Sequence, residues 1–311
     1  MLRPTLLINI VLYNPDKEKL QALLRVCLDY DRVKILLFDN SSYQQNLDPI
    51  HSENVTLYKS KENVGVAGAH FYACEMAEKE GFDFVLFLDQ DSQLPENFIT
   101  RMITGFYYLQ KLYPRLCAVG PCWQDPRINH WYQEKKVKNS LKTTLKAKLK
   151  RVLKVTQHRE KIHNFLRLDN ILISSGMMVC VPTLKEIGYP KKEYFIDLVD
   201  IEWCLRALSK DFQIEIVKDV QMQHTIGQFK STKNRFIQYQ TPTRYYYSIR
   251  NSFYLFRERK FPISFRLFIL IHNILEIKKI PFIPESKKSL LAAMSGIKDG
   301  ILMKKTLEYI G

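Results

Sequence analysis

The sequence lacks features that mark several common protein classes. It has no C-x-x-C pair, no internal repeat and no low-complexity tract. Its six cysteines have no His or Cys companions at the spacing of a zinc site, so they predict reduced, mostly buried thiols in a cytosolic protein. The 311 residues are enough to bury a core in one large or two modest domains.

Long apolar runs are also missing. The stretch "LLINIVLY" (6–13) is short and has no small-residue cleavage site, so it predicts a first strand and not a signal peptide. The strongly apolar stretch 263–277 is shorter than the roughly 20 residues that span a bilayer, and it contains Arg266, His272 and Glu276. We expect it to form either a buried helix or a helix lying at a membrane interface.

Acidic residues are scarce relative to basic ones. The formal net charge is +15, which is typical of proteins with an anionic partner: nucleic acid, acidic lipid or phosphorylated substrates. Solubility alone is the alternative explanation. The imbalance is strong in 134–161, part of a predicted basic amphipathic insertion at 134–165. Its apolar residues recur at helical spacing: Val137, Leu141, Leu145, Leu149, Val152 and Val155. This pattern fits either a solvated helix packed on the domain or a helix lying on an anionic membrane.

Strand-like and helix-like segments alternate over residues 5–120. Strands are predicted at 5–13, 33–40, 54–60, 82–91 and 116–121, and helices at 16–28, 65–81 and 95–112. This order predicts an α/β fold with a mostly parallel sheet and helices on both faces. Ligands of such sheets bind beyond the carboxyl ends of the strands. Three polar clusters fall at those ends: Tyr13-Asn14, Asp39-Asn40 and Asp89–Asp91.

The second half of the chain begins with similar elements and then changes. Strands are predicted at 170–182 and 213–219, with a helix within 193–212 between them. From Pro242 onward the composition is mainly helical. We therefore predict one domain at 1–240 and a helical, membrane-associating C-terminal region at 241–311.

The stretch "VLFLDQDSQ" ends a buried strand on two carboxylates, Asp89 and Asp91, which repel each other. A divalent cation and a phosphate can share that charge, because hard Mg²⁺ or Mn²⁺ prefers oxygen ligands. Residues i and i+2 of a strand point the same way, so a D-x-D pair suits one ligand. A D-x-D pattern alone is common in loops and is a weak indicator of a metal site. It becomes a stronger indicator here because it follows an apolar strand in an α/β unit.

A second acidic group lies in "FIDLVDIEWCLRA", where Asp197, Asp200 and Glu202 cannot all be ion-pair partners of Arg206. Asp200 fits two roles: a cap of the following helix, or a general base that takes a proton from a hydroxyl. His224 follows a predicted strand, and beside the aspartates it is a candidate metal ligand.

In order along the chain, "FDNSS", "ENVGVAGA", "LFLDQDS", "FIDLVDIEWCLRA" and "HTIG" resemble the family 2 glycosyltransferases. The resemblance covers roughly residues 5–258. Within the family, "LDQDS" is most similar to bacterial rhamnosyltransferases of cell-wall or O-antigen polysaccharides. The resemblance implies the GT-A fold, a Rossmann-like nucleotide-binding sheet joined to an acceptor-binding half.

The resemblance also implies roles for single residues. The nucleotide base would be bound by Asp39, with Tyr13 and Asn14 lining the same pocket. Asn63 and Gly65 would pass close to the donor, and Gly176 would lie beside the sugar.

For the chemistry, the same resemblance implies that Asp91 binds the metal, with Asp89 nearer the ribose or metal and His224 completing the metal site. Asp200 would be the catalytic base. The helix that carries Asp200 also carries Trp203 and Arg206, for which it implies supporting roles in donor binding.

The implied reaction is an inverting transfer of L-rhamnose from dTDP-β-L-rhamnose, with Mg²⁺ or Mn²⁺. The acceptor would be a hydroxyl of a polyprenyl-diphosphate-linked glycan, at the cytoplasmic face of an anionic cell membrane. Another donor, UDP-galactofuranose or a UDP-hexose, is the first alternative. A nucleic-acid-binding protein is a distant one, suggested by the charge and by the aromatic and basic residues of 244–251. An inactive scaffold of the same fold is disfavoured by the intact set Asp39, Asp91 and Asp200.

Overall fold

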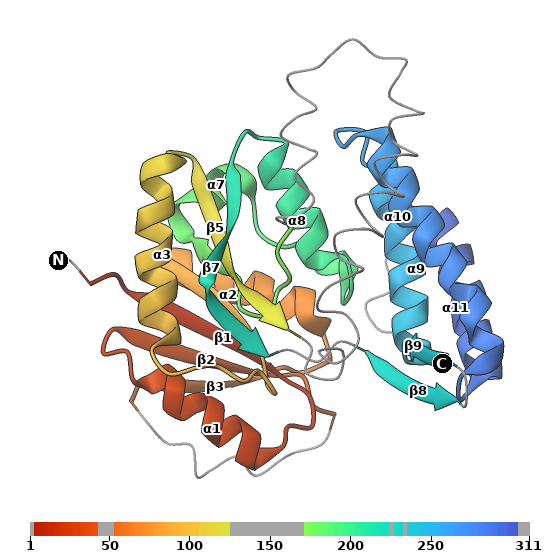
Figure 1. Cartoon of the computed structure of the whole chain (residues 1–311), viewed down its shortest axis with the longest axis horizontal. Coiled ribbons are helices and arrows are strands. Elements are labelled where there is room, and N and C mark those ends of the chain that lie inside the picture. The colour runs from red at the N-terminus through yellow and green to blue at the C-terminus, as the bar shows by residue number, and fades with distance from the viewer. Residues whose placement is uncertain (1–2, 43–52, 125–170, 224–226, 233–234, 304–311) are drawn as a thin grey trace.

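The protein is described from a computed structural model, and the described residues are 3–42, 53–124, 171–223, 227–232 and 235–303. Seven strands form one sheet in the order β3-β2-β1-β4-β6-β5-β7 (Figure 1). Neighbouring strands are parallel except at β6, which is antiparallel to β4 and β5. The predicted mostly parallel sheet is confirmed.

The first half of the chain follows the predicted alternation. Its elements are β1 (Leu6–Leu12), α1 (Lys17–Leu28), β2 (Val33–Asp39), β3 (Val55–Lys59), α2 (Gly65–Glu80), β4 (Phe84–Asp89), α3 (Phe98–Leu112) and β5 (Leu116–Gln124). The Asp16 side chain accepts hydrogen bonds from the backbone N–H groups of Glu18 and Lys19 and caps α1. Gly81 ends α2 in the left-handed conformation, with φ 74°.

The second half contains β6 (Met178–Cys180), α7 (Leu184–Ile187), α8 (Val199–Leu208), β7 (Gln213–Gln223) and the separate hairpin β8 (Gln228–Thr232) and β9 (Arg235–Tyr239). Short 3-10 turns η4 (Val181–Thr183) and η5 (Lys192–Tyr194) flank α7. The strand expected over 170–182 is only three residues long, because Gly176 (φ 86°) turns the backbone immediately before it. The helix expected within 193–212 begins at Val199, because Phe195, Asp197 and Leu198 have positive φ angles that an α-helix excludes.

The sheet is covered on both faces, as predicted. Leu6, Ile8 and Ile10 of β1 point into one core cluster, which also contains buried residues of α1 and α3. Leu7 and Val11 point into a second cluster, with residues of α2 and α8. The six cysteines are free and four of them are fully buried, which confirms mostly buried thiols.

The C-terminal region consists of α9 (Pro242–Arg257), α10 (Ile263–Glu276), η6 (Ile277–Phe282) and α11 (Ser286–Ile301). Both α10 and α11 pack on α9 (Figure 1). Tyr245, Tyr246 and Tyr247 are at most 1% exposed, so 244–251 does not offer the base-stacking surface that the nucleic-acid alternative invokes. Within the described ranges, no helix has the length and apolar content needed to cross a bilayer.

Candidate functional site

The ends of three neighbouring strands bring the predicted polar clusters together. In the register of the sheet, Leu12 of β1 pairs with Asp39 of β2, and Val11 pairs with Asp89 of β4. Tyr13 and Asn14 follow directly after Leu12. The convergence predicted from the strand order is therefore present at one edge of the sheet.

The D-x-D segment does not continue the strand. Asp89 is the last residue of β4, and Ser92 N donates to Asp89 O at 3.1 Å, which closes a tight turn over Gln90 and Asp91. Ser92 Oγ accepts from Asp89 N at 3.1 Å and strengthens the turn. The expectation that alternation along a strand aligns the two carboxylates is thus wrong, because the turn sets their directions.

Gln90, between the two acids, ties their turn to the end of β1. Its Oε1 accepts from Tyr13 N at 2.7 Å, and its Nε2 donates to Tyr13 O at 3.1 Å. These two bonds give Gln90 a structural role that the sequence reasoning missed. No local pattern points to it, since its partner lies at another strand end.

The end of β2 is joined to the loops around it. Asp39 is 2% exposed, and its Oδ1 accepts from Ser41 N at 2.9 Å. Ser41 Oγ in turn accepts from Asn14 N at 2.8 Å. The buried Asn40 donates through Nδ2 to Gly65 O at 3.1 Å. Asp39 and Asn14 are therefore linked through Ser41.

The entry to α2 packs tightly against the segment before α8. Asn63 Oδ1 accepts from Gly65 N at 2.9 Å, and Phe195 O accepts from Ala67 N at 2.9 Å. Gly65 has φ 69°, and a Cβ there would lie 2.3 Å from Phe195 O. Only glycine fits this approach, so Gly65 fixes the distance between the two segments.

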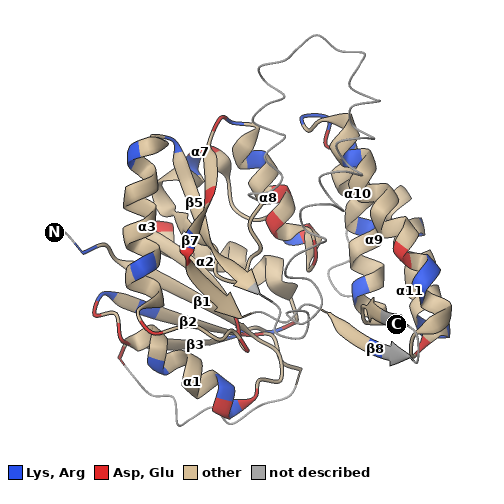
Figure 2. Ribbon diagram, in the orientation of Figure 1, with Lys and Arg blue, Asp and Glu red and all other residues tan. Residues whose placement is uncertain are grey.

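A cavity of about 370 Å³ collects both predicted acidic groups. Its lining includes Asp89, Asp91, Ser174, Asp197, Asp200 and Arg244. Gln240, Ser248 and Asn273 of the C-terminal half also line it. Figure 2 shows acidic positions on α8, which packs against α9 and α10 through the cluster around Leu205 and Leu255. The cavity thus lies where the sheet edge meets the C-terminal helices.

Asp200 is half-buried in this cavity, inside the first turn of α8. Its Oδ2 accepts from Ser174 N at 2.9 Å and its Oδ1 from Ile201 N at 2.8 Å. Burial raises its pKa above 3.8 and the charge of Asp197 raises it further, although the two backbone bonds act in the opposite direction. The N-cap position is Leu198, so the capping alternative for Asp200 is wrong.

The three acids of this stretch have separate partners. Glu202 pairs with Arg206 at 2.8 Å, and Asp197 accepts from Arg244 Nε at 3.1 Å. Among the described residues, no cation lies within ion-pair distance of Asp200. The carboxylate of Asp200 is held only by backbone donors, and each oxygen keeps a lone pair for a further proton.

Helix α9 holds the segment that carries Asp197. Asn251 Nδ2 donates to the carbonyls of Tyr194, Ile196 and Asp197 at 2.8, 2.8 and 2.9 Å. The neighbouring Arg250 is fully buried and donates to the carbonyls of Glu193 and Tyr194. These bonds span more than fifty residues of sequence, so reasoning from local motifs could not find them.

Of the nine predicted donor-binding residues, only Asp89 lines the cavity. The eight outside its lining include Trp203, Arg206 and Gly176. Trp203 is 1% exposed and donates through Nε1 to Gly188 O at 2.9 Å. Arg206 is buried and donates to Ile187 O at 2.9 Å. Gly176 N donates to Phe87 O at 2.8 Å, in the segment that carries Ser174. In their described contacts these three residues bond to backbone carbonyls, so they stabilise the backbone around the site. The predicted ligand His224 and the stretch 134–165 lie outside the described residues.

The residues present fit a divalent cation in part. Asp89 and Asp91 offer carboxylate oxygens to the same cavity, which is the ligand type that Mg²⁺ and Mn²⁺ prefer. In the part of the chain that the structure describes, no three His, Cys, Asp or Glu residues group as a complete metal site. A cation held here would need further oxygens from the substrate, as Mg²⁺ sites with substrate phosphates commonly do.

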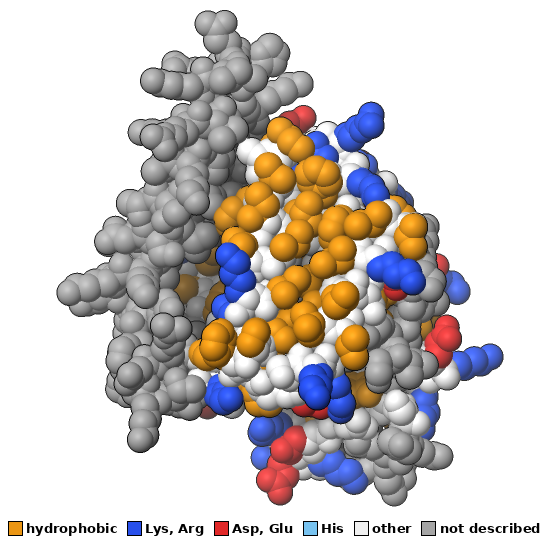
Figure 3. All heavy atoms as spheres, turned by 90° about the vertical axis from the view of Figure 1, so that its right-hand side faces the viewer, with side chains coloured by type: hydrophobic (Ala, Val, Ile, Leu, Met, Phe, Trp, Pro, Cys, Tyr) orange, Lys and Arg blue, Asp and Glu red, His pale blue; other side chains and the backbone are white. Residues whose placement is uncertain are grey.

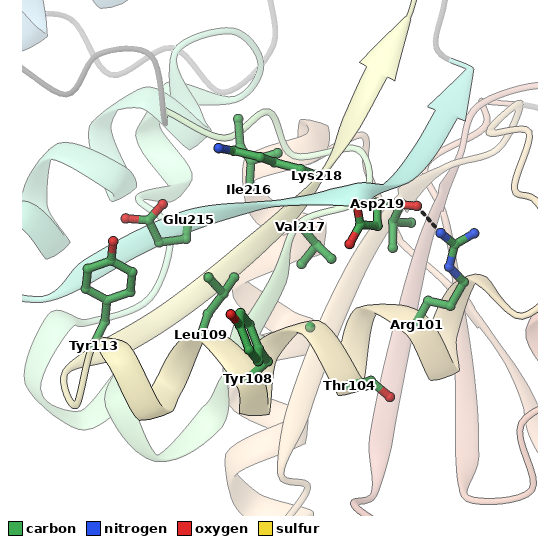
Figure 4. A pocket seen from close by; sticks show the side chains of 12 residues that line it. Arg101, Thr104, Tyr108, Leu109, Tyr113, Glu215, Ile216, Val217, Lys218 and Asp219 are labelled. Carbon is green, nitrogen blue, oxygen red and sulfur yellow. Dashed lines mark hydrogen bonds between the residues drawn. The ribbon is translucent and has the colours of Figure 1, made fainter.

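A second cavity, of about 930 Å³, lies between α3 and β7 (Figure 4). Its wall includes Arg101, Tyr108, Tyr113 and Lys218, and Arg101 donates to Asp219 O. None of the predicted site residues lines it. It follows the flank of the sheet, away from the strand ends where α/β proteins bind ligands, so the smaller cavity is the better candidate.

Comparison with known proteins shows which family and fold this chain resembles. The sequence model described as Glycosyl transferase family 2 matches residues 8–158. The dTDP-rhamnosyl transferase RfbF of Shigella flexneri is 29% identical over 299 residues, which cover 93% of this chain and 94% of that protein. The fold is similar to that of S. aureus TarS 1–349, with a TM-score of 0.52, 14% identity, and coverage of 97% of this chain and 82% of that one. The same TarS fragment in complex with UDP-GlcNAc also gives 0.52 at 14% identity, with 96% and 81% covered. Residues 8–158 of this chain match glycosyl transferase family 2, and the fold is that of the GT-A glycosyltransferases.

Proposed function

We propose that this glycosyltransferase moves L-rhamnose from dTDP-β-L-rhamnose to a hydroxyl group of a lipid-linked polysaccharide precursor, with inversion at the anomeric carbon. The observation that carries the proposal is the cavity in which the D-x-D acids and Asp200 lie together. The choice of donor rests on the similarity to the Shigella flexneri dTDP-rhamnosyl transferase over nearly the whole chain.

Asp200 is the general base of the proposed reaction. Its raised pKa makes the carboxylate a better proton acceptor than an ordinary aspartate. The acceptor hydroxyl gives its proton to Asp200, and its oxygen forms the new bond to the anomeric carbon. The bond to the nucleoside diphosphate breaks on the opposite face, and both electrons leave with the diphosphate.

Asp39, Tyr13 and Asn14 bind the nucleotide in this proposal, and Asn63, Gly65 and Gly176 shape the path of the donor. Asp89 and Asp91 would hold Mg²⁺ or Mn²⁺, with His224 as a further ligand. The cation supplies positive charge for the departing diphosphate. Arg244 adds a positive charge within the electrostatic reach of Asp89 and Asp200.

The acceptor in this proposal is a glycan on polyprenyl diphosphate at the cytoplasmic face of the cell membrane, where the enzyme is peripherally bound. The net charge of +15 supports an anionic lipid partner and a diphosphate head group. The basic stretch 134–165 is a proposed contact with that membrane.

Turnover and thermal shift over a panel of nucleotide sugars, with Mg²⁺ or Mn²⁺ added, test the donor. We expect dTDP-β-L-rhamnose to give the largest shift and the only substantial transfer. Preference for UDP-galactofuranose or UDP-glucose would overturn the rhamnosyl assignment and leave the family assignment intact.

A further inference from the structure

The C-terminal helices leave a broad apolar surface uncovered. Figure 3 looks onto the side of the molecule that carries α10 and α11, and hydrophobic side chains gather over most of it. The large side chains on α10, η6 and α11 that are at least 36% exposed are Ile263, Leu267, Ile271, Ile274, Leu275, Phe282, Leu290, Leu291, Met294 and Ile301. We call these residues the α10–α11 face. A patch of this extent on a soluble domain marks a site of association.

The positions on each helix follow one stripe. Ile263, Leu267 and Ile271 recur every four residues on α10, while Ile269 and Leu270 of the same helix are buried. On α11, Leu291 and Met294 are 64% and 59% exposed, while Ala292 and Ala293 are fully buried. Each helix therefore has a side packed on the protein and a side with no partner among the described residues.

The charge around this face has one dominant sign. Residues 241–303 contain eleven lysines and arginines and four acids. Each acid is already engaged: Glu258, Glu276 and Glu285 in ion pairs with lysines, and Asp299 by the hydroxyl of Tyr246. Figure 2 shows basic positions on α9, α10 and α11.

Two of the lysines lie on the apolar stripe itself. Lys287 is four residues before Leu291, and Lys298 is four residues after Met294, so all four project from one side of α11. Both lysines are exposed, and no acid of the described residues lies within ion-pair distance of either. Long lysine stems can lie along an apolar surface while their charged ends reach phosphate groups.

A second copy of the chain fits this face poorly. A two-fold interface places the same patch of both copies together, which would set Lys287 and Lys298 of one copy against the same basic face of the other. Like charges set against each other at an interface are destabilising. An anionic bilayer accepts the apolar side chains and pairs the lysines with lipid phosphates.

We infer that the α10–α11 face is a membrane-binding surface that inserts apolar side chains into an anionic lipid leaflet. The inference goes beyond the proposed function by placing the membrane on one side of the fold. Asn273 of α10 lines the catalytic cavity, while Ile274 and Leu275 beside it belong to the apolar face. The cavity and the bilayer surface are thus separated by about one helix diameter, roughly 10 Å. Such a spacing suits a lipid-linked acceptor. This link between the surface and the acceptor rests on the proposed function.

Sedimentation of the full chain with vesicles tests the surface without any sugar donor. One vesicle contains phosphatidylcholine with phosphatidylglycerol, and the other phosphatidylcholine alone. We expect Leu291→Gln with Met294→Gln to weaken binding to the anionic vesicles by about ten-fold or more for each side chain. Lys287→Gln with Lys298→Gln should weaken it by about five-fold for each lysine and should reduce its salt dependence.

The matched control is Tyr108→Gln with Leu112→Gln on α3, whose side chains are 65% and 59% exposed in another part of the molecule. We expect this variant to bind vesicles as the wild type does. Unchanged binding of the α11 variants, or an equal loss in the control, would overturn the inference. It would also be overturned by a wild-type dimer that becomes monomeric on Leu291→Gln with Met294→Gln. Because no donor is present, either outcome leaves the proposed reaction standing.

Discussion

The two acidic segments that meet in the cavity are held in different ways. Asp91 is exposed on a turn, which is tied by Gln90 to another exposed loop. The segment of Asp197 and Asp200 is fastened by Asn251 and Arg250, both fully buried in α9. Asp91 thus faces solvent on a surface turn, whereas the segment of Asp197 and Asp200 is anchored to the core of the C-terminal region.

The difference matches the two tasks in the proposed reaction. A proton acceptor must be placed within a fraction of an ångström of its target, and the bonds from buried Asn251 to three carbonyls of this segment provide that precision. A pair of acids that holds a cation with a diphosphate must admit a large charged ligand and release it again. The exposure of Asp91 suits that exchange.

Replacing Asp200 should have the largest effect on transfer. Asp200→Asn keeps the shape of the side chain and one of its two backbone hydrogen bonds, but it removes the proton acceptor. We expect kcat to fall by about 10²–10⁴-fold, the usual value of a general base. Calorimetry should show donor binding close to that of the wild type. Retained turnover in Asp200→Asn would show that another group takes the proton.

Removing the anchor of this segment should have the next largest effect. Asn251→Leu removes the side-chain amide that donates to the carbonyls of Tyr194, Ile196 and Asp197, so the segment should shift. A misplacement of about 1 Å can cost roughly 10²-fold in rate, so we expect kcat to fall by about that factor with KM for the donor little changed.

The control for Asn251→Leu is Ser252→Ala, which removes a buried hydroxyl bonded to Ile249 O within the same helix. Both variants are compared by kcat, KM and Tm. A drop in Tm with wild-type kcat in the folded fraction of Asn251→Leu would show that Asn251 only stabilises the core.

Asp91→Asn should act on binding, in contrast to Asp200→Asn. Mutation of a residue that only hydrogen-bonds to a metal ligand typically costs about 10–100-fold in metal affinity. Loss of a ligand itself should cost at least as much. Donor affinity measured with Mn²⁺ should therefore fall by at least about ten-fold, and affinity measured without metal should change little. Equal donor affinity of Asp91→Asn and the wild type with Mn²⁺ would remove Asp91 from the metal site.

Gln90→Leu should have a smaller effect, because the turn it holds is already exposed. The variant loses two hydrogen bonds to the backbone of Tyr13, each contributing about 0.5–1.5 kcal/mol. We expect donor affinity to weaken by only a few-fold. Gln93→Leu, three residues further on and outside the cavity lining, is the control. A loss as large as that of Asn251→Leu would contradict the proposed contrast between the two segments.

The sequence was informative for features that depend on the order of elements along the chain. The alternation of elements and the apolar run before Asp89 were enough to predict the sheet and the edge at which the polar clusters meet, because parallel strands end at a common side. The turn over Gln90 and the positive φ angles before α8 were not predictable, since both depend on contacts with distant segments.

The C-terminal half contributed the part of the site that no motif predicted. Arg244 and Asn251 reach the segment that carries Asp197 from a helix whose sequence suggested a base-stacking surface. Their burial and their partners become visible only when α9 is packed against the segment before α8. Long-range pairing of this kind leaves no periodicity in the sequence.

The smallest expected effect concerns pH. Burial and the negative charge of Asp197 raise the pKa of Asp200, so the unprotonated base is lost as the pH falls through that raised value. Asp197→Asn removes the negative neighbour and leaves Arg244 without its anion, and both changes favour the carboxylate form of Asp200. The acid limb of the kcat profile should therefore move to lower pH, whatever the height of the plateau. Glu186→Gln, on an exposed side chain outside the cavity, should leave the limb in place. A limb that stays fixed in Asp197→Asn, or moves to higher pH, would show that the titrating base is not Asp200.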